Sequence, residues 1–134
     1  METDTITLSP IGIVKSEIKD GKDMPLGGIK AQIEVLPQYI EALERIDESS
    51  HLWILSWFHK AARDVMKVVP RKANPEAGEF GVFAVRTPVR PNPIALTLVK
   101  LERVQGNILY VTGLDAIDGT PVLDIKPYFK NDIV

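Results

Sequence analysis

The amino-acid sequence predicts a mainly β domain, and three of its features lead to that conclusion. Short segments in which apolar and polar residues alternate recur along the 134 residues, a period typical of half-buried strands. Glycine, proline and aspartate cluster between these segments, where the chain has to turn. Only one segment has helical spacing, so the strands are not separated by helices as in a Rossmann sheet. About seven strands and one short helix predict an antiparallel or mixed β-barrel.

The first predicted elements are two strands and the helix. Residues 11–14 and 31–35 alternate and predict strands, and the Gly-, Asp- and Pro-rich residues 20–30 between them predict a loop. Pro37 suits the first turn of a helix. Its apolar face is predicted to consist of Ile40, Leu43 and Ile46.

The middle of the chain holds one clear strand and two short ones. Residues 51–58 are almost continuously apolar and predict a buried strand. Residues 61–69 have an ambiguous period, and we interpret those after Asp64 as a strand. Residues 70–79 are punctuated by proline and glycine and predict a loop, and residues 80–85 predict a short strand.

The last third predicts a hairpin and a final strand. Residues 94–104 and 108–114 alternate around a three-residue turn at 105–107. Residues 115–121 contain Asp-Gly and predict a tight turn. Residues 122–129 predict the last strand.

Length and composition are those of one domain covering residues 1–134. No apolar segment approaches the roughly 18 residues that span a bilayer, which predicts that the protein is not a membrane protein. The N-terminus has no secretory pattern. The chain has no cysteine, which excludes disulfides, thiolate metal sites and cysteine nucleophiles. These features predict a cytoplasmic protein.

Charge is distributed unevenly along the chain. Residues 60–103 carry nine basic and four acidic side chains, whereas the remainder carries seven basic and fourteen acidic ones. Such asymmetry is expected where one surface meets an anion. A salt-bridged surface without a partner would show the same pattern, so charge leaves both alternatives open.

A proline-rich loop precedes the strand at 94–104. The loop contains Pro88, Pro91 and Pro93. Each proline fixes its own φ angle and restricts the backbone conformation of the residue before it. A loop stiffened in this way loses little entropy when a ligand binds, so Arg90 and Asn92, together with Arg86 just before the prolines, are candidate donors to a carboxylate, a phosphate or a base edge. The alternative is a rigid connection between strands.

Three acids gather in residues 113–128. Asp115, Asp118 and Asp124 lack the distal glutamate and the alternating donors of a calcium loop, so no metal site is predicted. The structural alternative is that Asp118 forms a turn before Gly119 and that Asp115 caps backbone amides. His51 and His59 lie at the two ends of one strand, roughly 26 Å apart by strand rise, and so are not expected to share a metal.

Three motifs in order resemble those of a known family. "HLWILSWFH" begins at His51, "GVFAVRTPVRPNPI" at Gly81 and "LDAIDGTPVLDIKPY" at Leu114. Together they resemble the TsaA-like (YaeB/VirR) family, which includes the TrmO tRNA methyltransferases, from about residue 11 to 128. The resemblance implies a single-sheet β-barrel that binds S-adenosylmethionine and acts as a homodimer on the anticodon loop of tRNA. The implied reaction is methylation of N6 of threonylcarbamoyl-adenosine beside the anticodon.

The resemblance also implies which residues form the site. The implied cofactor contacts are Leu26, Gly27, Gly28, His59, Lys60, Arg86, Leu96, Asp115, Ala116, Ile117 and Asp118. Arg86 and His59 are the candidate catalytic residues, with His59 a candidate general base. Arg90 and Asn92 are expected to bind the substrate.

Two departures from the family pattern leave the acceptor open. Ala95 stands where the family usually has glycine, which removes backbone freedom. The sequence also stops soon after Tyr128, where the resemblance to bacterial TrmO proteins leads us to expect a C-terminal extension. A small-molecule methyl acceptor, or cofactor binding without catalysis, are therefore alternatives.

Overall fold

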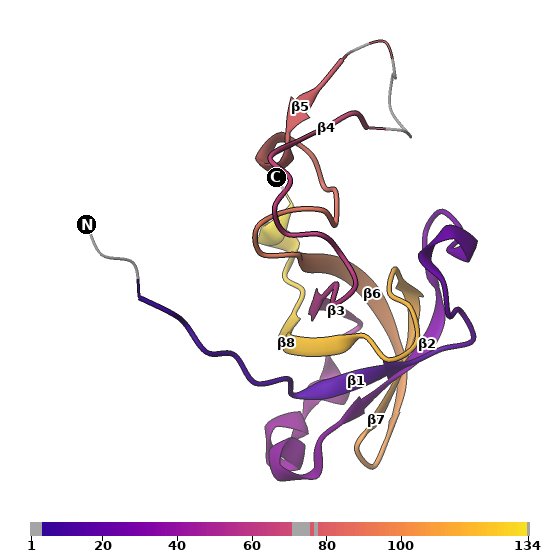
Figure 1. The fold of residues 1–134 in the computed structure, drawn as a ribbon. Helices are drawn as coiled ribbons and strands as arrows, with labels where there is room; N and C mark the ends of the chain where they lie inside the picture. The colour runs from indigo at the N-terminus through magenta and orange to yellow at the C-terminus, as the bar shows by residue number, and fades with distance from the viewer. Residues whose placement is uncertain (1–3, 71–75, 77, 134) are drawn as a thin grey trace.

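A closed antiparallel barrel of six strands forms the body of the protein in a computed structural model, which describes residues 4–70, 76 and 78–133. The strand order around the barrel is β1-β2-β7-β6-β3-β8 (Figure 1). The strands are β1 (Gly12–Lys15), β2 (Ile29–Val35), β3 (His51–Trp57), β6 (Ile94–Gln105), β7 (Ile108–Leu114) and β8 (Pro121–Pro127). The predicted single-sheet barrel is confirmed, and these six strands match the predicted ones closely.

Two predicted strands are much shorter in the structure. The segment after Asp64 forms only β4 (Lys67–Val68), which pairs with β5 (Phe80–Gly81) in a separate two-stranded sheet. The rest of the strand predicted at 80–85 is wrong, because Val82–Ala84 form the 3-10 turn η5. Most of the loop predicted at 70–79 lies outside the described residues.

The predicted helix is present as the seven-residue 3-10 helix η2 (Pro37–Leu43), with Pro37 at its start. Single 3-10 turns elsewhere in the described chain are η1 (Gly21–Asp23), η3 (Ile46–Glu48), η5 and η6 (Lys130–Asp132). The tighter 3-10 winding changes the buried face, so Leu43 is buried while Ile40 stays 48% exposed. None of the helices in the described residues has the length and hydropathy to cross a membrane.

Alternating side chains of all six barrel strands fill one core. Along β3 the even-numbered residues Leu52, Ile54 and Ser56 are buried, and their odd-numbered neighbours face outward. The same period in β1 and β2 turns Val14, Ile33 and Val35 inward. The alternation visible in the sequence thus determines which residues form the core.

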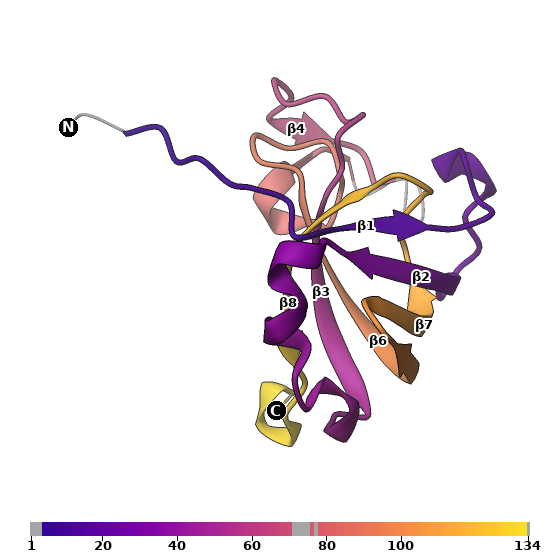
Figure 2. The same ribbon diagram turned by 90° about the horizontal axis from the view of Figure 1, so that it is seen from below.

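Chain order places the loops at two ends of the barrel. Because neighbouring strands are antiparallel, the connections β1–β2, β3–β6 and β7–β8 lie at one end, and β2–β3 and β6–β7 lie at the other. Residues 58–93, here called the arm, form the β3–β6 connection, and their described part projects from the barrel (Figure 1). Figure 2 shows β4 and the C-terminal segment on opposite sides of the molecule.

The β7–β8 connection takes a different route from the other two at this end. β7 lies between β2 and β6, whereas β8 lies between β3 and β1, so residues 115–120 have to cross the end of the barrel. Gly119 donates its backbone N–H to Val14 of β1, which confirms the crossing. The segment seals the core, since Ala116 and Thr120 are buried.

Candidate functional site

Every residue predicted for the site lies at the arm end of the barrel. Residues 26–28, here called the glycine loop, belong to the β1–β2 connection. The arm contributes His59, Lys60, Arg86, Arg90 and Asn92, and residues 115–118 cross the end of the barrel between these two connections. Leu96 lies near the start of β6, at the same end. The strand order therefore brings three segments that are distant in the sequence to the same end of the barrel.

The glycine loop packs backbone to backbone against the end of β7. A Cβ on Gly28 would lie 2.6 Å from the carbonyl carbon and oxygen of Gly113, and Gly28 has a φ of +77°. Gly27 also has a positive φ, but open space surrounds it. Only glycine satisfies both the conformation and the close approach at position 28, which fixes the loop beside the crossing segment.

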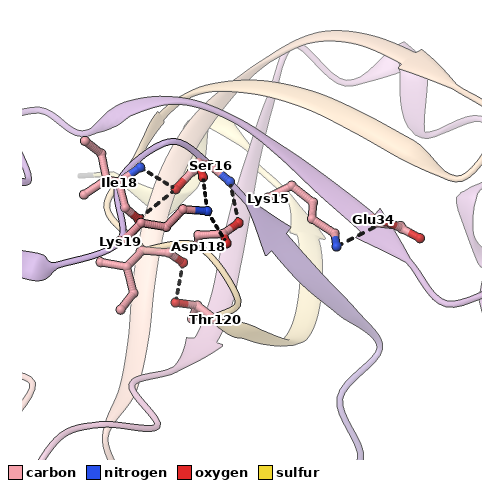
Figure 3. Close-up of polar contacts among 8 residues, drawn as sticks. Lys15, Ser16, Ile18, Lys19, Glu34, Asp118 and Thr120 are labelled. Carbon is pink, nitrogen blue, oxygen red and sulfur yellow. Dashed lines mark hydrogen bonds and ion pairs between the residues drawn. The ribbon is translucent and has the colours of Figure 1, made fainter.

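Asp118 fastens the crossing segment to the β1–β2 connection (Figure 3). Its Oδ1 accepts a hydrogen bond of 3.0 Å from the backbone N–H of Ser16, and its Oδ2 lies 2.6 Å from Nζ of Lys19. The Lys19 hydrogen bond and then the Ser16 amide hold the pKa of the Asp118 carboxyl below its usual value. Both carboxylate oxygens thus bind groups of the protein itself. The sequence indicates only a local turn at Asp118, whereas these partners lie in the β1–β2 connection.

The other residues of the crossing segment divide between the core and the solvent. Ala116 is buried, and the carbonyl of Ile117 accepts a 2.7 Å hydrogen bond from Oγ1 of Thr120. Asp115 is exposed and has no hydrogen bond or ion pair within the described residues. Its carboxylate is therefore available to accept hydrogen bonds from a ligand.

The arm begins with His59 and Lys60, which lie in a turn after β3 and are both exposed. The backbone N–H of Phe58 donates to the carbonyl of Pro93, so this turn lies beside the end of the proline loop. Arg86 is exposed and has no hydrogen bond or ion pair in the described part of the chain. Its guanidinium can therefore pair with an anion.

Arg90, by contrast, is engaged with the arm itself. Its guanidinium donates to three carbonyls, those of Val82 at 2.8 Å, Thr87 at 3.2 Å and Val85 at 3.3 Å. These carbonyls lie on both sides of Arg86 in the chain. The side chain of Arg90 thus folds the segment that presents Arg86.

Arg63 also holds the arm together, a role that the sequence does not predict. Its Nε donates to the carbonyl of Pro91 at 2.7 Å, and its Nη2 donates to Oδ1 of Asn92 at 3.1 Å. Its guanidinium also stacks on the ring of Trp57, 5.1 Å from the ring centre. Arg63 joins the first and last parts of the arm to the end of β3, and the sequence holds no signal for this because the partners are 28 and 29 residues away.

Two apolar site residues are exposed. Leu26 is 85% exposed in the glycine loop, and Leu96 is 48% exposed on the outer face of β6. Ala95 beside it is buried and pairs with Ser56 within the β3–β6 ladder, so the residue that departs from the family pattern does not interrupt the strand.

The two histidines lie at opposite ends of β3. His51 accepts or donates a hydrogen bond through Nδ1 with Oγ of Ser50 at 3.0 Å and has an edge-to-face contact with Tyr128. Only His59 belongs to the site end. Among the described residues, no three His, Asp or Glu side chains gather to hold a metal ion.

A groove of about 700 Å³ lies on the outer surface of the barrel next to this end. It is lined by residues of β1, β2 and β7 and of the connection after β1, among them Lys15, Ser16, Ile18, Lys30 and Tyr110. Ser16 and Ile18 also bind the backbone and side chain of Asp118, so the groove adjoins the crossing segment.

Comparison with known families confirms the relationship. The sequence pattern of the tRNA-methyltransferase O N-terminal domain matches residues 13–132. The chain belongs to this family. An Archaeoglobus fulgidus protein named as an S-adenosyl-L-methionine-binding protein is 43% identical over 125 residues, which cover 90% of this chain and 88% of the relative.

Two proteins with longer chains are similar as well. The mouse tRNA (adenine(37)-N6)-methyltransferase is 49% identical over 90 residues, 67% of this chain and 21% of that protein. The crystal structure of TrmO from Pseudomonas aeruginosa matches with a TM-score of 0.78 and 36% identity over 98% of this chain. This chain spans 59% of that TrmO chain, and its residues 13–132 match the N-terminal domain of the family.

Proposed function

We propose that the protein is an S-adenosylmethionine-dependent methyltransferase that methylates N6 of adenosine 37 in tRNA, with threonylcarbamoyl-adenosine as the acceptor. Membership of the TrmO family and the names of its relatives support the reaction and the cofactor. Such a role favours the cytoplasm, as does the absence of cysteine.

One observation carries the proposal. The glycine loop, the arm and the crossing segment come from three separate connections, yet the topology brings all three to one end of the barrel. Methyl transfer from a sulfonium is an in-line displacement, which depends on alignment more than on a strong acid or base. A rigid surface that collects a few polar groups suits that requirement.

The groups at this end fit the parts of S-adenosylmethionine. Arg86 would pair with the carboxylate of the methionine moiety, and Asp115 would accept from hydroxyl or amino groups. Leu26 and Leu96 offer apolar surface to the adenine, and the glycine loop allows backbone to approach closely. When bound, the cofactor supplies an electrophilic methyl group.

The arm residues would act on the acceptor. His59 is exposed beside Lys60 and would take the proton that N6 loses. Asn92 keeps its amide NH₂ for the substrate, because its contact with Arg63 uses the oxygen. Arg90 would contribute by positioning Arg86, since its donors meet three carbonyls of the arm.

We further propose that two copies assemble through the outer face near Leu96. Ile94 and Leu96 alternate outward on β6 and remain 40% and 48% exposed. A single chain leaves the site open to water, and a partner covering this face would help to exclude it. Sedimentation should show a dimer, and Ile94→Glu should give monomers, with Ile40→Glu at the other end as the control.

A second candidate function is cofactor binding without methyl transfer. One observation favours it: the Archaeoglobus relative, of which this chain covers 88%, has a name that states binding alone. A small-molecule acceptor is the third alternative, favoured by the overall net charge of −2.

The deciding experiment is incubation with labelled S-adenosylmethionine and either unmodified or threonylcarbamoylated tRNA, followed by nucleoside mass spectrometry. We expect label on N6 of the modified nucleoside alone. Arg86→Ala should abolish turnover while the circular dichroism spectrum is kept. Binding of the cofactor with no label in any tRNA pool would contradict the proposal and favour the second candidate.

A further inference from the structure

Phe83 is a large aromatic side chain that is exposed to solvent. It is 81% exposed in η5, whereas its neighbour Val82 is buried. Burial of a phenylalanine ring is worth roughly 1.5–3 kcal/mol, so folding gains little from this one. The turn therefore buries one apolar residue and presents the next to the solvent.

Contacts within the arm fix the turn that carries the Phe83 ring. Cζ of Arg90 lies 6.0 Å from the centre of the Phe83 ring, at the outer limit of a cation–π contact. The same guanidinium binds the carbonyls of Val82 and Val85, on either side of the turn. The backbone N–H of Val82 also donates to Met66, which fixes the turn against the other strand of the arm. A side chain on such a turn is preorganised.

The surroundings of Phe83 are apolar and basic. Met66 is 57% exposed, and Lys67 pairs with Gly81, two residues before Phe83. Over residues 58–93 the chain has seven basic and three acidic side chains, a net charge of +4, although the whole protein is at −2. Among the described residues, Lys60, Lys67 and Arg86 have no ion pair with an acid.

Exposed aromatic rings among unpaired cations suit single-stranded nucleic acid. Bases stack on such rings whatever their sequence, and phosphates meet the cations. A second copy of the chain fits less well, because a two-fold contact through Phe83 would bring Lys67 and Arg86 close to their own copies. Charge complementarity thus favours RNA as the occupant.

We infer that Phe83 is a stacking platform for an unpaired base of the RNA substrate, with Lys67 beside it contacting phosphate. This inference rests on the proposed function, since it assigns part of the tRNA surface. It adds a residue that is not among the predicted site residues and that acts in substrate binding.

The test measures binding and turnover separately. Fluorescence anisotropy with an anticodon stem-loop RNA should show about 5- to 160-fold weaker binding for Phe83→Ala and Phe83→Leu, the range expected for one stacked base. Phe83→Tyr should bind as the wild type does, because it keeps the ring. The affinity for S-adenosylmethionine, from calorimetry, should stay within about twofold in all variants, since the ring lies outside the candidate cofactor residues. Ile40→Ala, which removes an exposed apolar residue at the other end of the barrel, is the control.

Each contrary outcome has a separate meaning. Equal RNA affinity for Phe83→Ala and wild type, or no binding of the RNA by wild type, overturns the stacking role. Wild-type protein that binds the RNA in a Phe83-dependent manner but transfers no methyl group contradicts the proposed function instead. Loss of a dimer in Phe83→Ala would show that the ring contacts a second copy, which also overturns the inference.

Discussion

Two adjacent glycines show how a single residue can determine the geometry of the site. Gly27 and Gly28 both have a positive φ, but only Gly28 approaches another backbone closely. The conformation costs an L-residue roughly 1–2 kcal/mol, and a clash with backbone adds about 1–3 kcal/mol. Position 28 therefore carries both penalties and position 27 only one.

We expect Gly28→Ala to lower the free energy of unfolding by about 2–5 kcal/mol, because its Cβ would meet the Gly113 carbonyl group. Gly27→Ala is the matched control and should lose only about 1–2 kcal/mol. Urea denaturation followed by tryptophan fluorescence measures both. Equal losses would show that the close packing of the two backbones does not contribute.

Asp118 links the stability of the crossing segment to pH. Its pKa is lowered in the folded protein by Lys19 and by the Ser16 amide, so the contribution is complete above the ordinary aspartate pKa of about 3.9 and is lost as the pH falls through the lower folded value. Asp118→Asn should thus lower the urea midpoint at neutral pH. The difference from the wild type should shrink as the pH falls through the folded pKa of Asp118, below which the carboxyl is protonated in both states.

The control for this prediction is Asp64→Asn, because Asp64 is exposed and has no ion pair in the described part of the chain. It should leave the urea midpoint unchanged over the whole pH range. A difference between Asp118→Asn and wild type that persisted at acid pH would mean that the ion pair is not its source.

At the scale of elements, the conformation of the arm is held by the hydrogen bonds of two arginines more than by its two-stranded sheet. β4 and β5 have two residues each, too few to fold alone. Arg63 binds the proline loop, and Arg90 binds the carbonyls around Arg86. The prolines limit the conformations of the loop, and the arginines select one of them.

Arg63→Ala should loosen the arm and leave the barrel intact. We expect faster hydrogen exchange at backbone amides of residues 58–93 and unchanged exchange in β1, β2 and β7, with about 1 kcal/mol lost from global stability. Arg63→Lys keeps the charge but not the forked contact, so it should rescue only part of the effect. Unchanged exchange in Arg63→Ala would show that the prolines alone hold the loop.

At the scale of the whole molecule, charge separates the arm from the rest of the protein. The arm is positive although the protein is negative overall, so an RNA should approach from one side. The barrel topology puts the candidate cofactor residues at the base of the arm. An RNA bound to the arm would therefore lie at the end of the barrel that holds the candidate cofactor residues.

This arrangement predicts a strong salt dependence of tRNA binding. With about three phosphate contacts, the affinity should fall about twenty-fold between roughly 50 and 200 mM salt, because counterions are released on binding. The affinity for S-adenosylmethionine, measured by calorimetry over the same range, should change little. A methyl acceptor whose KM did not respond to salt would favour a small molecule.

The sequence by itself determined the barrel strands, the core and the identity of the candidate residues. Strand period is a local property, so the alternation of apolar and polar residues is enough to assign Leu52, Ile54 and their counterparts to the core. The motifs that begin at His51, Gly81 and Leu114 indicated the family, and its sequence pattern covers 13–132.

Only the tertiary structure decided how those residues are used. The closed barrel brings Asp118 to Ser16 and Lys19. The folded arm brings Arg63 and Arg90 to the carbonyl groups that they bind, and it limits the strand there to Phe80–Gly81. Local periodicity carries no information about such partners, since Asp118 is 102 residues from Ser16. The crossing of 115–120 follows from strand order, which is set when the sheet closes on itself.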